Sequence, residues 1–177
     1  MPSRDRRIDA LVDAALDELR EHGYEGLTVR NAARRAGLAP ATAYTYFGSK
    51  DHLVTEVFWR RVQALPDGSS RSRSVLTRLT AALDDIIGLI TDEPELINAS
   101  TAAVLADDPD VEGLRTLIGA RLDAHLATAL GAGGDPAVLR ALNLAVSGAL
   151  LQAGMGYLAH DDLAPRLHEA ARLLLGR

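Results

Sequence analysis

The sequence predicts an all-α protein, with a small N-terminal domain followed by a larger helical domain. Apolar residues recur every three or four positions along most of the 177 residues, which is the spacing of one helix face. No window alternates apolar and polar residues with a period of two, and β-branched and aromatic residues are few, so strands are not expected. Glycine and proline divide the pattern into about nine helices.

The first two predicted helices are bounded by clear local signals. An apolar stripe begins at Ile8, and this helix is expected to end near Gly23 because glycine is a frequent C-terminal stop. Thr28 offers an N-cap hydroxyl to a second helix, which runs to Arg35 and is ended by Gly37. A short helix followed by a glycine turn is therefore expected here.

Proline and serine mark the beginnings of the next two helices. Pro40 lies where a third helix would make its first turn, because the missing N–H of proline costs nothing there. This helix is expected to end at about Tyr46. Ser49 caps a fourth helix that continues to about Leu65. The sequence Pro-Asp-Gly-Ser-Ser at 66–70 then predicts a domain junction.

Beyond the junction the helical pattern resumes in five further segments. These predicted helices cover residues 75–90, 94–105, 109–130, 136–158 and 163–175. We therefore expect a small three-helix domain over residues 1–53, with the fourth helix connecting to about residue 65. A larger helical domain is expected over residues 66–177.

Charge is divided unevenly between the two parts of the chain. The net charge is −5, but residues 1–61 hold ten Lys or Arg and nine Asp or Glu, whereas residues 62–177 hold nine and fifteen. The N-terminal part is therefore one charge positive and the remainder six charges negative. Between Gly26 and Lys50 there are four basic residues and no acidic one. Such a local field suits a polyanionic partner, while the acidic remainder keeps the molecule soluble.

Several classes of protein are disfavoured by the sequence. The chain has no cysteine, which removes disulfides and thiolate metal sites and fits a cytoplasmic location. The histidines near the C-terminus lack metal-ligand spacing, and the glycine loop at 131–134 has no preceding strand. No metal, no cofactor and no enzyme are therefore expected. We expect no signal peptide, and the interrupted apolar stretch 141–159 is predicted to be a buried helix rather than a membrane span.

The segment from Gly23 to Leu53 carries the functional signal. Two short helices joined by a tight glycine turn would meet at a steep angle, so that the second could enter the major groove of DNA. The informative residues are Thr28, Ala33, Ala36-Gly37-Leu38, Tyr44-x-Tyr46-Phe47-x-Ser49-Lys50 and Leu53. In this register, over about thirty residues, the segment resembles the TetR family of bacterial regulators.

The resemblance implies a transcriptional regulator that binds a double-stranded DNA operator. Thr28 and the start of the second helix are expected to anchor a phosphate, and Lys50 to add a charged phosphate contact. Arg30 is the candidate for a guanine contact. Tyr44 and Tyr46 would reach the DNA backbone, although Tyr44 could equally be a core aromatic. Base edges would be faced by Pro40, Ala41, Thr42 and Thr45, whose methyl groups can meet thymine.

The segment departs from the family pattern at several positions. Ala39 stands where the family usually has serine, so one N-cap oxygen is missing. Ala32 and Ala43 replace larger aliphatic residues, which predicts a thin core for the small domain. For Arg34 and Arg35 a solvated helix face is favoured over a DNA contact, and Phe47 is expected in the core.

For the larger domain the resemblance implies a homodimer through the last two helices and an effector site among the middle ones. The small residues of 136–158 would allow two helices to approach closely, and they could equally serve packing within one chain. Paired readers contact half-sites about one helical turn apart, which predicts a palindromic operator. Candidate contacts for a small, apolar effector are Ile87, Asn98, Thr101, Leu122, His125 and Gln152. The same mixture occurs in any helical core, and His125 is expected to be buried or at an interface.

Three hypotheses about function follow from the sequence. The first is a ligand-responsive dimeric repressor that a small molecule releases from DNA. The second is a DNA-binding regulator without a small-molecule pocket, controlled by a protein partner or by its own abundance. A thermal-shift screen against apolar metabolites separates these two. The third is a helical enzyme or scaffold with a vestigial reader, which the absence of DNA binding at low salt would favour.

Overall fold

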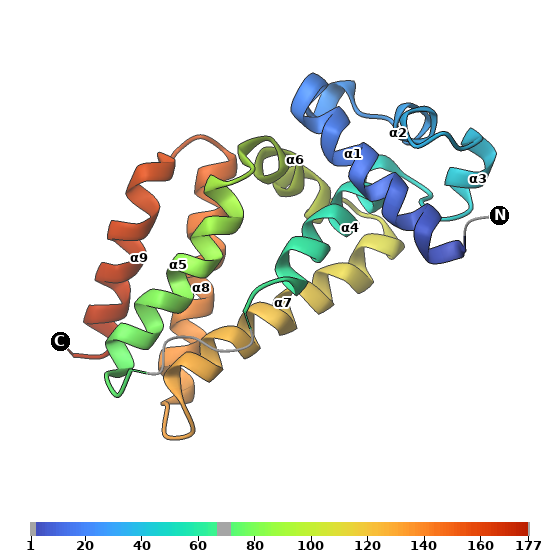
Figure 1. Cartoon of the computed structure of the whole chain (residues 1–177). Helices are drawn as coiled ribbons and strands as arrows, with labels where there is room; N and C mark the ends of the chain where they lie inside the picture. Colours follow the sequence, from blue (N-terminus) through green and yellow to red (C-terminus); the bar gives the residue numbers. More distant parts are fainter. Residues whose placement is uncertain (1–2, 67–71, 177) are drawn as a thin grey trace. The chain divides into compact units, whose positions relative to one another are not determined.

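The computed structural model confirms the all-helical fold. It describes residues 3–66 and 72–176, and over these residues it contains nine α-helices and no strand. The helices are α1 (Arg4–Gly26), α2 (Val29–Arg35), α3 (Pro40–Tyr44), α4 (Lys50–Gln63), α5 (Val75–Thr91), α6 (Pro94–Val104), α7 (Pro109–Leu130), α8 (Pro136–Gly154) and α9 (His160–Leu174) (Figure 1). Apart from Pro66, the predicted domain junction lies outside the described residues.

The helices group into two compact units, and each unit is made from two separate stretches of chain. The first unit takes the chain up to Arg60 together with Pro94–Thr116, and the second takes Arg61–Glu93 and the chain from Leu117 onwards. Helix α6 therefore belongs to the same unit as α1, against which it packs. The division into a DNA-binding domain over residues 1–53 and a regulatory domain over residues 66–177 stays a prediction.

The core of the first unit contains several alanines. Leu11 and Ala15 of α1 are fully buried, as are Ala32 of α2 and Ala43 of α3. Helix α1 packs against α2, and α2 packs against α3. The side chains of Ala32 and Ala43 therefore lie in the core as expected, where a single methyl group fills each position and lets short helices approach closely.

In the second unit α9 packs against both α5 and α8, and the three helices run side by side (Figure 1). Leu79, Leu83 and Ile86 of α5 are buried, as are Leu142 of α8 and Leu163 of α9. These side chains form one face of each helix, which is the arrangement that the three-to-four spacing predicts.

Two predicted helix ends in the second unit are wrong. Helix α8 ends at Gly154, four residues before the predicted end, and α9 begins at His160 rather than at Leu163. Gly156 adopts a φ of +74°, and the N–H groups of the next two residues both donate to the carbonyl of Gln152. A left-handed glycine therefore closes α8 although the apolar pattern continues beyond it.

The prediction that 141–159 forms a buried helix is correct for one face only. By length and composition α8 is the one described helix that could cross a membrane. Within the second unit it buries Leu142 and Val146, whereas the side chains of Leu144 and Met155 are 75% and 52% exposed. The exposed apolar face of α8 is therefore available to another surface.

Candidate nucleic-acid interface and effector region

The turn between α2 and α3 is closed by a glycine in the left-handed region. Gly37 has a φ of +68°, and its N–H donates to the carbonyl of Arg34 at 3.2 Å. The N–H of Leu38 donates to the carbonyl of Ala33 at 2.8 Å. These two bonds satisfy carbonyls at the end of α2 and reverse the chain, so that α3 begins at Pro40.

The N-terminus of α2 is capped by a side chain and lies at the surface. The Thr28 hydroxyl accepts a hydrogen bond from the N–H of Asn31 at 3.0 Å, as predicted for an N-cap. Thr28 and Arg30 are both exposed. The positive end of the helix dipole and the basic residue Arg30 therefore both belong to the exposed first turn of α2, an arrangement that attracts anions.

Helix α3 carries its predicted DNA-facing residues on its exposed side. Pro40, Ala41 and Thr45 are exposed, and the Tyr44 side chain is 50% exposed, so Tyr44 is not a core aromatic. Phe47 is buried, as predicted. Thr42 and Tyr46 are partly buried. No side chain caps α3 at Ala39, which agrees with the missing serine.

Lys50, at the start of α4, is held against the end of α1. Its Nζ lies 3.9 Å from the centre of the Tyr24 ring and donates to the Tyr24 carbonyl at 3.3 Å. The Tyr24 hydroxyl in turn donates to the Asp51 carboxylate. Burial, together with this carboxylate, raises the pKa of Tyr24 above its usual range, so the hydroxyl stays a donor. The ammonium group of Lys50 is thus held in place by Tyr24.

The start of α4 is also bonded to the turn between α6 and α7, a contact that sequence reasoning missed. The Ser49 hydroxyl accepts from the N–H of His52 at 3.0 Å and donates to the Asp108 carboxylate at 2.6 Å. The His52 Nδ1 lies 3.4 Å from a carboxylate oxygen of Asp110. Hydrogen bonds from Ser49 and from the Asp110 N–H lower the pKa of Asp108. The loop after α3 is therefore held by residues far away in the chain.

Arg35 has a structural role that sequence reasoning did not assign. Its Nε donates to the carboxylate of Glu18 at 2.7 Å, and its Nη1 donates to that of Glu21 at 2.7 Å. The hydrogen bond from Arg35 lowers the pKa of Glu21. Glu18 is only 5% exposed, so Arg35 neutralises a buried carboxylate and joins α2 to α1. Arg34 is exposed, and within the described part of the chain its side chain donates to Asn31 of its own helix.

Comparison with known proteins agrees with this helix-turn-helix geometry. The family profile described as "Bacterial regulatory proteins, tetR family" matches residues 11–57. An HTH-type transcriptional regulator of Mycobacterium tuberculosis is 41% identical over 98% of this chain and 84% of its own length. The chain belongs to the TetR family.

Further TetR-family proteins share the length and the fold. The HTH-type transcriptional repressor KstR of Mycolicibacterium smegmatis is 27% identical over 98% of this chain and 88% of its own. A solved TetR transcriptional regulator from Rhodococcus sp. RHA1 superposes with a TM-score of 0.78 at 22% identity, covering 98% of this chain and 97% of that one. The protein is therefore a DNA-binding transcriptional regulator of helix-turn-helix type.

The six candidate effector contacts of this TetR-family chain are distributed over both units. Ile87, Leu122 and His125 are buried in the second unit, where Gln152 is exposed. The remaining two, Asn98 and Thr101, belong to the first unit; Asn98 is exposed, and the Thr101 hydroxyl donates to a backbone carbonyl of its own helix. An effector role for any of the six stays a prediction.

His125 is buried, as the sequence predicted. Its side chain is 2% exposed, and its Nε2 lies 3.2 Å from a carboxylate oxygen of Asp85 in α5. The neighbouring carboxylate, that of Asp84, lies 2.7 Å from the Nε2 of His168 in α9. Adjacent carboxylates of α5 therefore each face a histidine from a different helix of the second unit.

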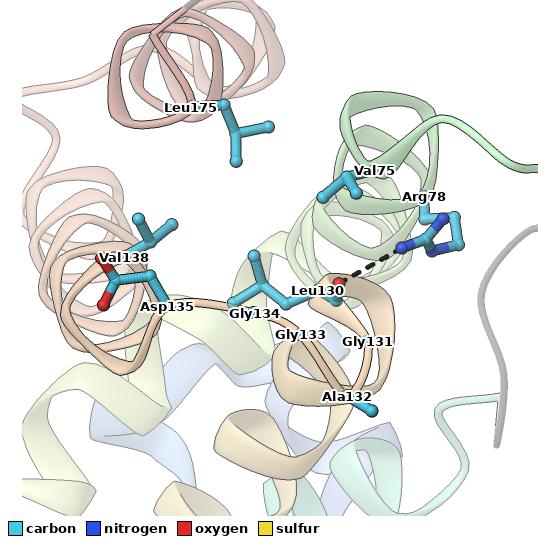
Figure 2. Close-up of a pocket in the computed structure, with 10 residues that line it drawn as sticks. All are labelled: Val75, Arg78, Leu130, Gly131, Ala132, Gly133, Gly134, Asp135, Val138 and Leu175. Atoms are coloured by element: carbon cyan, nitrogen blue, oxygen red, sulfur yellow. Dashed lines mark hydrogen bonds between the residues drawn. The ribbon is translucent and has the colours of Figure 1, made fainter.

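A cavity of about 370 Å³ lies in the second unit beside the glycine loop between α7 and α8 (Figure 2). Apolar side chains face it from α5, α7, α8 and the chain after α9, namely Val75, Leu130, Val138 and Leu175. At its edge Arg78 donates to the carbonyl of Leu130 at 3.2 Å (Figure 2). It also donates to the carbonyl of Ala129 at 2.8 Å. Arg78 thus satisfies the last carbonyls of α7 and keeps the cavity wall in place.

Proposed function

We propose that this TetR-family regulator is a homodimeric repressor that binds a palindromic operator through α3 and is released by a small apolar effector. The observation that carries the proposal is the exposed face of α3, which is positioned by the Gly37 turn and flanked by the basic residues Arg30 and Lys50. The name of KstR supports repression, because that relative is a transcriptional repressor.

The proposed contacts divide into phosphate contacts and base contacts. The start of α2 at Thr28 and the ammonium of Lys50 would each hold a phosphate, which fixes the register of the reader on DNA. Arg30 would reach a guanine, and Tyr44 and Tyr46 would contact the backbone. The base edges would be faced by Pro40, Ala41, Thr42 and Thr45.

The test is fluorescence anisotropy with a 30-base-pair duplex that the protein itself selects from a randomised library. We expect the wild-type protein to bind the selected duplex tightly and in preference to random DNA. In Lys50→Ala the slope of log affinity against log salt should fall by about one, the value for one phosphate contact, and affinity should weaken on selected and random duplexes alike. Arg73→Ala, at an exposed position just before α5 and outside both α3 and the proposed dimer helices, removes the same charge and should leave both affinities unchanged. Failure to select any duplex at low salt would exclude the regulator mechanism proposed here.

The homodimer is proposed to form through α8 and α9. The exposed apolar residues Leu144 and Leu151 are seven positions apart and so share one face of α8, and exposed Met155 follows directly after its last residue. Leu173 of α9 is 72% exposed. The small residues Ala149 and Ala153 are buried within the chain, so the proposed contact between subunits uses mainly the large side chains. An exposed apolar patch of this kind marks an interaction surface.

The effector is proposed to be apolar because both candidate sites in the second unit are apolar. One is the buried group of Ile87 and Leu122 near His125, and the other is the 370 Å³ cavity, a volume within the usual range for small-molecule sites. A solved FadR of Bacillus subtilis, similar in fold, is in complex with stearoyl-CoA, and that ligand also has an aliphatic part.

A thermal-shift series with octanoate, decanoate and 1-decanol tests the effector proposal. We expect at least one of them to raise the melting temperature and to weaken operator binding. Val138→Trp fills the cavity, so loss of the response would place the effector there, whereas a retained response would point to the residues around His125. If none of the three probes acts, the small-molecule mechanism is replaced by control through a protein partner or abundance.

A further inference from the structure

The side chains of α3 and its flanking residues lack the groups that usually recognise guanine and adenine. Residues 39–47 read Ala-Pro-Ala-Thr-Ala-Tyr-Thr-Tyr-Phe, without an amide, a guanidinium, an ammonium or a carboxylate. Two-point hydrogen bonding to guanine requires arginine or lysine, and two-point bonding to adenine requires asparagine or glutamine. Helix α3 therefore has no means of making either contact.

The hydroxyl of Thr45 is engaged within the chain. Its Oγ1 donates to the carbonyl of Thr42 at 2.6 Å, which uses the only proton that this hydroxyl can donate. Guanine presents only acceptors in the major groove, so Thr45 in this conformation cannot recognise it. The γ-methyl group remains as the other end of an exposed side chain.

The rest of the exposed face of α3 is also hydrocarbon near the helix start. Ala39, Pro40 and Ala41 are exposed and present only methyl and methylene groups, and Ala43 is buried. The Tyr44 hydroxyl lies at the end of a long side chain, which the proposed function assigns to the DNA backbone. The part of α3 available to base edges is therefore mainly a surface of methyl and methylene groups, and the hydroxyl of the partly buried Thr42 is the polar group that remains on it.

Resting on the proposed docking of α3 in the major groove, we propose that this regulator recognises thymine through its C5-methyl group. That methyl group is the one apolar feature that a base pair of unmodified DNA offers in the major groove. Against cytosine or guanine, the same methyl surface would cover a polar group without replacing its water, which costs free energy. The operator half-sites therefore contain thymine at the positions that face Ala41 and Thr45.

Replacing thymine by deoxyuridine tests the proposal atom by atom, because only the C5-methyl group is lost. In duplexes selected by the protein, the substitution is made at one half-site thymine at a time and affinity is measured by anisotropy. We expect about fourfold weaker binding for each contacted methyl group removed, the value for one buried carbon. Deoxyuridine outside the half-sites serves as the control and should change nothing.

A matched pair of variants identifies the protein side of the contact. Thr45→Ser keeps the hydroxyl and removes the γ-methyl, so it should bind the thymine operator about fourfold more weakly and lose its sensitivity to one deoxyuridine. Thr45→Val keeps both branches of the side chain as methyl groups and removes the hydroxyl, so it should retain that sensitivity. Circular dichroism and binding to random duplex show that both variants are folded.

The outcomes separate this inference from the proposed function. If a selected duplex binds tightly and deoxyuridine at every half-site thymine leaves affinity unchanged, methyl recognition is wrong and the DNA-binding proposal stands. Selected half-sites with no thymine would overturn it in the same way. If no duplex is selected at all, the proposed docking of α3 fails, and the inference fails with it.

Discussion

Two adjacent arginines show how strongly the role of a residue depends on what faces it. Arg35 donates to Glu18 and Glu21 of α1, and Glu18 is 5% exposed. The Arg34 side chain is exposed, and among the described residues it bonds to Asn31, one turn earlier. Identical side chains at successive positions therefore join two helices in one case and cover a helix surface in the other.

Arg35→Ala should destabilise the first unit because it leaves the Glu18 carboxylate buried without its cation. We expect the melting temperature to fall by more than about 3 °C, as monitored by circular dichroism. Arg34→Ala removes the same side chain and should leave the melting temperature within about 1 °C of wild type. Equal losses in the two variants would show that the ion pairs with α1 contribute nothing to folding.

These long-range partners could not be predicted from the sequence. Glu18 and Arg35 are 17 positions apart, and Ser49 and Asp108 are 59 apart. Helical periodicity indicates which face is buried, but not which charged residue of another helix lies opposite. The exposure of Pro40, Ala41 and Thr45 was predictable because the family pattern specifies the register of this segment, whereas the attachment of Ser49 depends on how α6 and α7 fold back.

The ends of individual helices show which helix boundaries can be predicted from local sequence signals. Thr28, Gly37 and Pro40 act where the sequence indicated, since capping depends only on residues within one turn. The predicted end of α8 was wrong because apolar residues continue beyond Gly154, while the backbone turns at Gly156. Periodicity alone does not distinguish a helix from an apolar chain that packs without one.

The same glycine-to-alanine substitution should have opposite effects at Gly37, in the turn before α3, and at Gly88, inside α5. Gly37→Ala places a side chain at a φ of +68° with no atom close to the new Cβ, so the cost is conformational, about 1 kcal/mol of stability. Gly88→Ala lies inside α5, also with open space around the Cβ, and should increase stability by up to about 1 kcal/mol. Urea denaturation measures both, and a stabilising Gly37→Ala would refute the assigned turn.

At the scale of the whole molecule, the exposed apolar face of α8 predicts that one charged residue on it disrupts the proposed dimer. Leu144→Asp should convert the proposed dimer to monomers at micromolar concentration in analytical ultracentrifugation and reduce operator affinity at least tenfold. Leu144 is 75% exposed, so the monomer itself should lose no more than about 0.5 kcal/mol of stability.

Leu105→Asp is the control for that experiment. Leu105, which follows α6, is 69% exposed. Leu105→Asp therefore places the same charged side chain at a similarly exposed position outside the proposed interface. We expect this variant to sediment as wild type does. Dissociation by Leu105→Asp and not by Leu144→Asp would move the interface away from α8, and a monomeric wild-type protein would exclude the dimer.

The interleaving of the two units along the chain limits how such regulators can be recombined. Residues 94–116 pack in the same unit as the helix-turn-helix, with α6 against α1 and Asp108 bonded to Ser49. A chimera that joins residues 1–60 to the remainder of another regulator would have non-native residues packed against α1 and opposite Ser49. Exchange of DNA specificity between relatives should therefore succeed when residues 94–116 are transplanted together with residues 1–60. A single crossover after residue 60 would leave the helix-turn-helix without its native packing partners.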